Sequence, residues 1–152
     1  MATIDVLGAN GEVHSVPLGS KITLHKHDRL VDHTICDKII KLKYSEIKII
    51  MLMLRDCDMN NFISKKKMHE WDESEGVLSR ALRTLKINDW IKDAAKKSGL
   101  KIIKKGYMIN PKMIRKSRVI TEYFVMIHAY NNTDRIIIAK PFRQIVKEAN
   151  GE

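Results

Sequence analysis

The chain has 152 residues, of which 44% are hydrophobic and 30% charged, and its formal net charge is +10. This length accommodates one ordinary hydrophobic core with appendages, and the apolar fraction excludes a disordered chain. The most apolar run, from Ile47 to Leu54, is interrupted by Lys48 and is far shorter than the roughly 20 residues that cross a bilayer. We therefore expect a soluble protein without a membrane partner.

The excess positive charge lies beyond the first quarter of the chain. Residues 1–40 contain four Lys or Arg and five Asp or Glu, whereas residues 41–152 contain 24 and 13. Residues 86–118 alone contain eleven basic residues against two acidic ones. Because basic side chains neutralise phosphates and release counterions, this pattern favours a polyanion partner. A lysine-rich solvated surface is the alternative explanation.

The cysteines and histidines indicate neither a disulfide nor a closed metal site. Cys36 and Cys57 lie in unrelated contexts, and without a signal peptide we expect free thiols in a reducing cytoplasm. His25, His27, His33 and Cys36 are zinc-ligand types, but their spacing matches no known closed site and no second ligand pair follows. We expect solvated histidines, no metal and no other cofactor.

The first quarter of the chain predicts a hairpin and a helix. Residues 2–18 alternate around Asn10-Gly11, the strongest short signal for a β-hairpin. Residues 28–42 carry apolar side chains near helical spacing, which predicts an amphipathic helix. Nothing in either element indicates chemistry, so we expect the hairpin to serve as an edge or an arm.

Residues 44–57 predict a central helix. Ser45 is the expected N-cap, with an acidic residue in the first turn. The main buried stripe is expected to be Ile47, Ile50, Met51 and Leu54, with further apolar residues widening it. Turn residues follow at 58–61.

The stretch from Phe62 to Ile91 predicts two helices joined by a tight turn. Ser64 is expected to cap a two-turn helix reaching Trp71, and Ser74 a second helix after an acidic turn. This arrangement is typical of a helix-turn-helix, although an ordinary αα-hairpin has the same apolar spacing. At 100° per residue, Val77, Leu78, Ala81, Leu82 and Leu85 face inward, while Gly76, Ser79, Arg80 and Arg83 face outward.

A basic hairpin follows the second helix. Asn88-Asp89 ends the helix, and residues 90–111 predict two or three strands with a glycine-containing basic tip. Such a hairpin after a helix-turn-helix is the wing of a winged helix, whose lysines lie along the phosphate backbone or in the minor groove. After the strands, Pro111 is expected to start a one-turn helix over residues 112–116.

A motif in the second half of this region includes Ser74, Leu78, Arg80, Leu82 and Leu85, then Asn88 to Ile91, and finally Gly106 to Pro111. With these residues, the run from Ser74 to Pro111 resembles the RepL-type plasmid replication proteins of Gram-positive bacteria. The likeness covers about residues 44–116, and much of it is the winged-helix pattern shared with many repressors. The longer wing, residues 93–99, departs from the family pattern and leaves a phage or plasmid regulator open.

The C-terminal extension, residues 117–152, predicts additional apolar structure. Residues 119–130 are densely apolar, and their β-branched and aromatic content slightly favours a strand of a hairpin over a helix. Residues 135–140 predict a strand, and Pro141 precedes a C-terminal helix over residues 142–149. This surface is either extra core or a homodimer interface, and a dimer is our expectation because DNA-site symmetry makes dimers common.

No constellation for catalysis is present in the sequence. There is no phosphate-binding glycine loop, no GxSxG and no HExxH. Tyr107, Tyr123 and Tyr130 are poor candidates for nicking nucleophiles, because such enzymes need a His-x-His metal site and His25-Lys26-His27 precedes a helix. We expect neither enzyme activity nor a small-molecule substrate.

The sequence as a whole predicts an α+β fold. A winged helix-turn-helix domain over residues 21–116 lies between a hairpin or arm at 1–20 and an extension at 117–152. The expected function is sequence-specific binding of double-stranded DNA by a plasmid or phage replication initiator or its regulator. Alternatives are a winged-helix transcriptional repressor, including a metal-responsive one, an RNA-binding module and a protein-interaction winged helix.

The expected DNA contacts come from both helices and the wing. Arg80 and Arg83, with Ser79, reach base edges or nearby phosphates from the groove. Lysines at the start of the preceding helix and in the wing meet the backbone. The full set is Ser74, Ser79, Arg80, Arg83, Thr84, Lys65, Lys66, Lys67, Lys96, Lys97, Lys101, Lys104 and Lys105.

Overall fold

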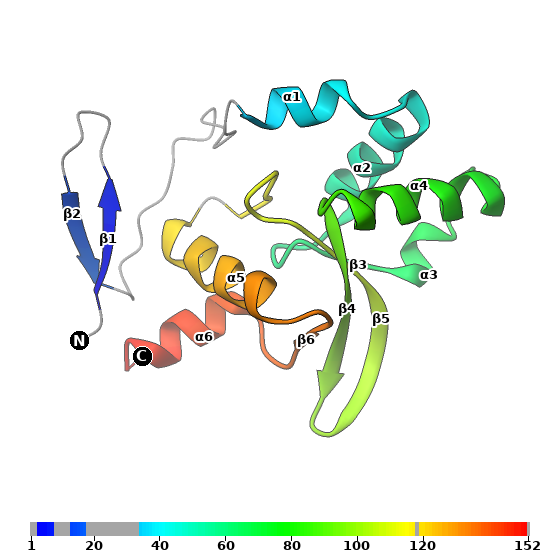
Figure 1. Ribbon diagram of the computed structural model, residues 1–152. Coiled ribbons are helices and arrows are strands. Elements are labelled where there is room, and N and C mark those ends of the chain that lie inside the picture. Colours follow the sequence, from blue (N-terminus) through cyan, green and yellow to red (C-terminus); the bar gives the residue numbers. More distant parts are fainter. Residues whose placement is uncertain (1–2, 8–12, 18–33, 118, 152) are drawn as a thin grey trace.

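A computed structural model describes residues 3–7, 13–17, 34–117 and 119–151 as a mixed α+β structure (Figure 1). None of the helices in these ranges has the length and apolarity to cross a bilayer. The helices are α1 (Thr34–Ile40), α2 (Tyr44–Asp56), α3 (Lys65–Met68), α4 (Glu75–Ile87), α5 (Ile120–Asn132) and α6 (Phe142–Ala149). The strands are β1 (Thr3–Leu7), β2 (Val13–Pro17), β3 (Phe62–Ser64), β4 (Ile91–Ser98), β5 (Lys101–Ile109) and β6 (Ile136–Ile138).

The two N-terminal strands form a sheet of their own. β1 and β2 pair antiparallel, with Thr3 opposite Pro17 and Leu7 opposite Val13. The predicted strands are therefore confirmed, while the Asn10-Gly11 turn falls outside the described residues.

Four strands form the central sheet in the order β3-β5-β4-β6. β5 runs antiparallel to both β3 and β4, whereas β6 lies parallel to β4. β4 and β5 are joined by the two-residue loop Gly99-Leu100, because Ser98 pairs with Lys101. Gly99 has φ +61°, the left-handed conformation that a tight hairpin needs and that glycine adopts without a Cβ penalty.

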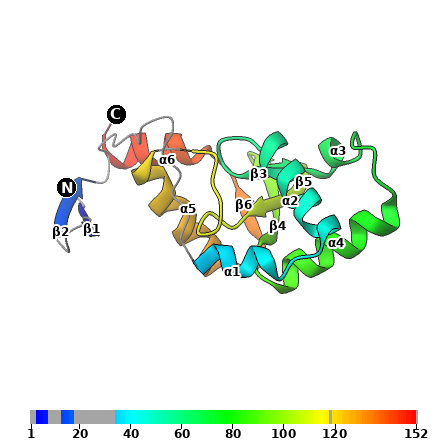
Figure 2. The same ribbon diagram turned by 90° about the horizontal axis from the view of Figure 1, so that it is seen from above.

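Each face of this sheet is covered by helices. Alternate residues of a strand point to opposite faces, so Ile63 and Tyr107 enter one hydrophobic cluster and Phe62 and Met108 the other. The first cluster is completed by residues of α1, α2, α3 and α4, and the second by residues of α5, β6 and α6. Both views place α5 and α6 on one side of the sheet and α2, α3 and α4 on the other (Figures 1 and 2).

Helix α2 begins one residue before the predicted cap and buries a different face. Tyr44 is already helical, so the prediction of Ser45 as N-cap is wrong, and the Glu46 carboxylate accepts the Lys43 backbone N–H at 3.1 Å. Met51, predicted to be buried, is 53% exposed. The buried stripe runs instead through Glu46, Ile49, Ile50 and Met53 at i, i+3, i+4 and i+7.

The apolar run 119–130 is a helix, so the slight preference for a strand was wrong. β-branched and aromatic residues suit either element, and the uncovered second face of the sheet decides between them. α5 turns Met126 and Tyr130, four residues apart, onto that face, where Met108 also lies. The predicted strand at 135–140 is confirmed as the shorter β6, and the C-terminal helix is confirmed as α6.

The apolar surface of residues 117–152 packs within the chain itself. Phe142 and Ile138 are 4% and 5% exposed and share a cluster with Phe62 of β3. The Phe142 backbone N–H also donates to the buried Asn60 side chain at 3.1 Å. This segment therefore extends the core that supports the central sheet.

Candidate nucleic-acid interface

The short helix α3 follows β3 without an intervening loop. The Ser64 hydroxyl accepts the Lys67 backbone N–H at 3.2 Å, as predicted for a capping residue. The helix ends at Met68 and not at Trp71, because the Glu70 and Trp71 N–H groups donate to carbonyls three residues back. The three exposed lysines of α3 directly follow the last residue of strand β3.

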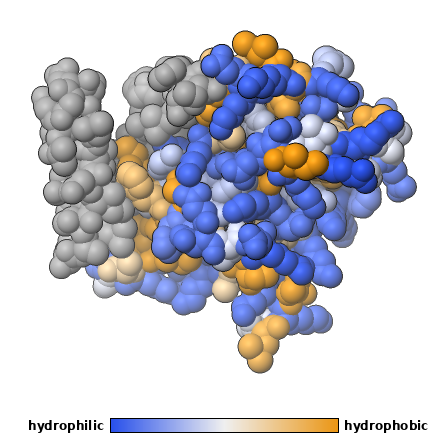
Figure 3. Space-filling view, viewed as in Figure 1, coloured by the Kyte–Doolittle hydropathy of each residue, from blue (hydrophilic) through white to orange (hydrophobic). Residues whose placement is uncertain are grey.

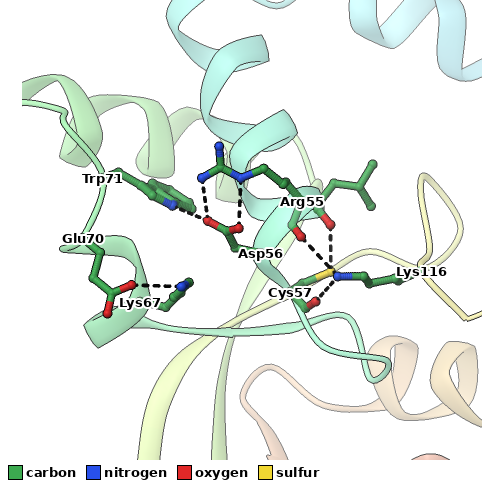
Figure 4. Close-up of polar contacts among 8 residues, drawn as sticks. Arg55, Asp56, Cys57, Lys67, Glu70, Trp71 and Lys116 are labelled. Carbon is green, nitrogen blue, oxygen red and sulfur yellow. Dashed lines mark hydrogen bonds and ion pairs between the residues drawn. The ribbon is translucent and has the colours of Figure 1, made fainter.

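The turn between α3 and α4 is held against the C-terminal end of α2. The Trp71 indole N–H donates to the Asp56 carboxylate at 2.7 Å, and Arg55 makes two bonds to the same carboxylate at 2.9 Å (Figure 4). Hydrogen bonds from Arg55 and then Trp71 hold the pKa of Asp56 well below its usual range. Lys48 of α2 pairs with Glu73 in the same turn.

The end of α2 is closed by a lysine from beyond the sheet. The Lys116 ammonium donates to the carbonyls of Arg55 and Cys57 at 3.2 and 2.6 Å (Figure 4). These carbonyls lie at a helix C-terminus, where a positive charge is favourable. The Cys57 thiol donates to the Leu54 carbonyl at 3.4 Å, and burial raises its pKa to about 11.

Helix α4 presents the predicted outward face to solvent. The Ser74 hydroxyl accepts the Val77 N–H at 3.3 Å, which confirms the cap. Leu78, Ala81 and Leu85 are buried in the core, as predicted. Gly76, Ser79, Arg80 and Arg83 are all exposed, and no ion pair with a described residue holds either arginine.

Gly106 lets β5 approach β3 closely enough to join α3 to the β4–β5 hairpin. A Cβ at this position would lie 1.9 Å from the Ile63 carbonyl oxygen and 2.8 Å from the Ser64 Cα. Only a glycine is compatible with this spacing, since both obstacles are backbone atoms. The close approach sets Ser64, and the lysines after it, beside residues 104–106 of β5.

A groove of about 510 Å³ lies between α3 and β5. It is lined by the lysines of both elements, together with Ser64, Glu70 and Ile103. Lys67 pairs with Glu70 at 2.9 Å, and the other four lysines form no ion pair with an acidic side chain in the described part of the chain. The groove lysines are Lys65, Lys66, Lys67, Lys104 and Lys105.

A second hollow, of about 210 Å³, connects this groove to α4. Lys65 lines both, and Ser79 of the exposed α4 face lines the second. Its floor includes Tyr107, whose ring centroid lies 5.8 Å from the Lys65 ammonium and 5.9 Å from that of Lys86. Burial raises the pKa of Tyr107, so the phenol stays neutral between the two lysines.

Lys86 and Tyr107 were missed as site residues in the sequence. Lys86 follows Arg83 by three residues, so the outward spacing of the helix already indicated it. Its ammonium also reaches Asp93 at 3.3 Å, which ties the end of α4 to the start of β4. Tyr107 belongs to the motif run from Gly106 to Pro111, but only the tertiary structure shows that it lies between Lys65 of α3 and Lys86 of α4.

Two predicted contact residues are engaged elsewhere. Lys96 forms an ion pair with Asp58 and lies over the Phe62 ring at 5.1 Å, on the sheet face that α5 and α6 cover. Lys96 lies opposite the groove residue Lys104 in the β4–β5 register, but its ammonium is engaged by Asp58. Thr84 is half-buried and donates its hydroxyl proton to the Arg80 carbonyl at 3.2 Å. Lys97 is half-buried, whereas Lys101 is exposed near the end of the hairpin.

The root of the hairpin is held by buried asparagines. The Asn110 amide donates to the Asp89 carbonyl at 2.8 Å, and Asp89, with φ +61°, accepts the Tyr130 hydroxyl at 3.0 Å. Asn61, with φ +60°, donates to the carbonyls of Ile109 and Ile114 at 3.2 and 2.9 Å. The helix predicted at 112–116 is wrong, because the segment forms a turn closed on the Asn110 carbonyl.

The candidate metal ligands lie mostly outside the described residues. His25, His27 and His33 fall in undescribed ranges, while Cys36 is exposed on α1. Among the described residues, no group of three His, Cys, Asp or Glu side chains is placed to hold a metal ion.

Comparisons of the chain with protein-family models, curated proteins and solved structures found no match.

Proposed function

We propose that this protein is a winged helix-turn-helix that binds double-stranded DNA. α2, β3, α3, α4, β4 and β5 follow one another in the winged-helix order, with β3 pairing on β5 and β4–β5 as the wing. In this arrangement α4 enters the major groove. The observation that carries the proposal is the lysine groove between α3 and the wing, which connects through Lys65 to the exposed face of α4.

The charges support a phosphate partner in particular. The groove lysines come from two elements that only the β3–β5 pairing brings together. Like charges gathered in this way repel one another, and neutralisation by a polyanion removes that cost. The exposed Arg80 and Arg83 lie one turn apart on α4, a spacing that suits base edges or adjacent phosphates.

The biological role is proposed to be plasmid or phage replication initiation or its regulation. This step rests on the resemblance of residues 74–111 to RepL-type proteins. A winged-helix repressor shares the same DNA chemistry, so the arrangement of bound sites distinguishes the roles. Selection of bound fragments from a random duplex library is the test. A two-fold symmetric site supports a homodimer, whereas iterated direct repeats favour an initiator.

The groove is tested by a charge-matched pair of double variants. Lys104→Ala with Lys105→Ala removes two groove lysines, and Arg143→Ala with Lys147→Ala removes two exposed charges from α6. Duplex affinity is measured by fluorescence anisotropy across a salt series. Each lost phosphate contact lowers the magnitude of the log–log salt slope by about one, so we expect a decrease of about two for the groove variant only.

Equal slopes for both double variants would contradict the groove as the phosphate site. Structured RNA is included as a competitor, because an RNA-binding module would prefer it to the duplex. A protein-interaction winged helix would leave the affinity for both nucleic acids weak. Arg80→Ala separates base readout from general attraction. It is expected to lose about 1–3 kcal/mol on a selected site and much less on random DNA.

A further inference from the structure

The end of the β4–β5 hairpin carries an apolar side chain in full contact with solvent. Leu100 is 99% exposed, the second residue of the two-residue loop that begins with Gly99. Ile102 and Ile103, just behind it, are 40% and 56% exposed. In Figure 3 the tip of this hairpin, at the lower end of the molecule, is apolar beneath a largely hydrophilic surface. No packing within the described chain accounts for these side chains.

The hairpin extends beyond the sheet that supports it. β6 pairs with β4 only as far as Lys96, and β3 pairs with β5 no further than Gly106. Residues 97–105 therefore form a two-stranded arm without neighbouring strands. At about 3.3 Å per residue, the arm places Leu100 roughly 13 Å beyond the edge of the four-stranded region. The register shift between Lys96 and Lys97 interrupts the pairing within the arm.

The charge of the arm indicates what the tip meets. Residues 97–105, which form the arm, contain four lysines and no acidic residue. Lys101, Lys104 and Lys105 are exposed along the arm, and Lys104 and Lys105 also line the groove that reaches α3. A partner must therefore combine phosphates spaced along the arm with an apolar slot at its tip. The minor groove of DNA meets both requirements, since apolar wedges enter between its base steps.

We propose that the wing enters the minor groove and that Leu100 acts as a wedge between base pairs and kinks the duplex. The inference rests on the proposed function and adds a second activity to it, namely DNA bending. The two-residue loop is the shortest common hairpin connection, so it presents one side chain at a narrow end. Lys101 and Lys104 would contact the phosphates on either side of the groove.

The effect on affinity is expected to be small and the effect on shape large. A wedge gains by burying an apolar side chain but loses by unstacking a base step, and these two contributions are similar in size. We expect Leu100→Ala to change affinity by less than about tenfold while abolishing a kink in the range of about 20–90°. The variant folds normally, because Leu100 contributes nothing to the core.

The experiment measures binding and bending on the same duplex. A short duplex recovered by library selection carries a donor and an acceptor fluorophore at its two ends, and energy transfer reports the end-to-end distance. The chain is compared with Leu100→Ala and with Ile40→Ala, which removes a 78% exposed isoleucine from α1. The expected result is bending by the unchanged chain and by Ile40→Ala, and binding without bending by Leu100→Ala.

Other outcomes overturn the inference in distinguishable ways. Equal energy transfer for Leu100→Ala and the unchanged chain refutes the wedge but leaves duplex binding intact. Absence of duplex binding by every variant refutes the proposed function, and the wedge with it. The last measurement uses vesicles of anionic phospholipid. If the protein sediments with the vesicles only when Leu100 is present, and does not bend DNA, the hairpin tip binds a membrane surface instead.

Discussion

Gly106→Ala is expected to be among the most damaging single-methyl additions in this chain. The new Cβ would lie 1.9 Å from the Ile63 carbonyl oxygen, whereas ordinary contact begins near 3.4 Å. The two strands must therefore separate by about 1.5 Å, since the obstacle is backbone and cannot rotate away. That displacement breaks hydrogen bonds of the short β3–β5 pairing, which spans only Phe62 to Ser64.

The expected destabilisation is about 2–5 kcal/mol. Overpacking contributes about 1–3 kcal/mol, and one or two lost backbone hydrogen bonds contribute about 1 kcal/mol each. For a chain of this length the loss lowers the melting temperature by about 10 °C. The same displacement moves α3 away from the β4–β5 hairpin, so the proposed duplex binding is expected to weaken along with stability.

Urea unfolding followed by tryptophan fluorescence measures this effect, because Trp71 and Trp90 are both buried. Gly76→Ala is the matched control, since a Cβ at Gly76 meets nothing within 4 Å and the position is helical. The control is expected to gain about 0.4–1 kcal/mol. A Gly106→Ala protein within 1 kcal/mol of the unchanged chain would refute the reasoning from backbone contact.

Three further predictions concern the turn before α4, the two cysteines and the root of the β4–β5 hairpin. Trp71→Phe removes an N–H donor from Asp56 and is expected to cost about 1.5–3 kcal/mol near pH 7. Because the folded pKa of Asp56 is depressed, its stabilising effect is present above the unfolded pKa near 4 and lost as the pH falls below it. The cost of Trp71→Phe, measured by urea unfolding at several pH values, should therefore shrink below about pH 4; a constant cost would contradict the Asp56 bond. In a thiol-reagent assay at pH 8, exposed Cys36 is expected to react at once and buried Cys57 only after unfolding; two fast thiols would refute this. Asn61→Asp replaces two buried N–H donors by a carboxylate facing carbonyls and is expected to cost about 3 kcal/mol or more in thermal unfolding; a cost below 1 kcal/mol would show that Asn61 does not hold the hairpin root.

The second hydrophobic cluster combines residues from segments that are distant in the sequence. Phe62 and Met108 of the sheet pack against Tyr130 of α5 and Phe142 of α6. The Lys92 ammonium lies 4.5 Å from the Tyr130 ring centroid and donates to carbonyls at the end of α5. A truncation before α5 is therefore expected to unfold the central sheet rather than release an independent domain.

The sequence by itself determined the elements whose cause is local. Ser64 and Ser74 cap their helices because a side-chain oxygen accepts an N–H three residues away, a contact independent of the rest of the chain. The inward and outward faces of α4 follow from its 3.6-residue period, so Arg80 and Arg83 were recognised as exposed. The β4–β5 hairpin was likewise expected from the glycine-containing basic tip around Gly99.

Only the tertiary structure decided which lysines lie together. Lys104 joins Lys65 because β5 pairs with β3, and neither the register nor the clearance at Gly106 is encoded in a local pattern. Lys96 lies opposite Lys104 in the β4–β5 hairpin but pairs with Asp58, a residue distant in the sequence that no local pattern places beside it. Residues 120–132 form a helix because it covers the apolar second face of the sheet. The composition of the segment alone could not distinguish this helix from a strand.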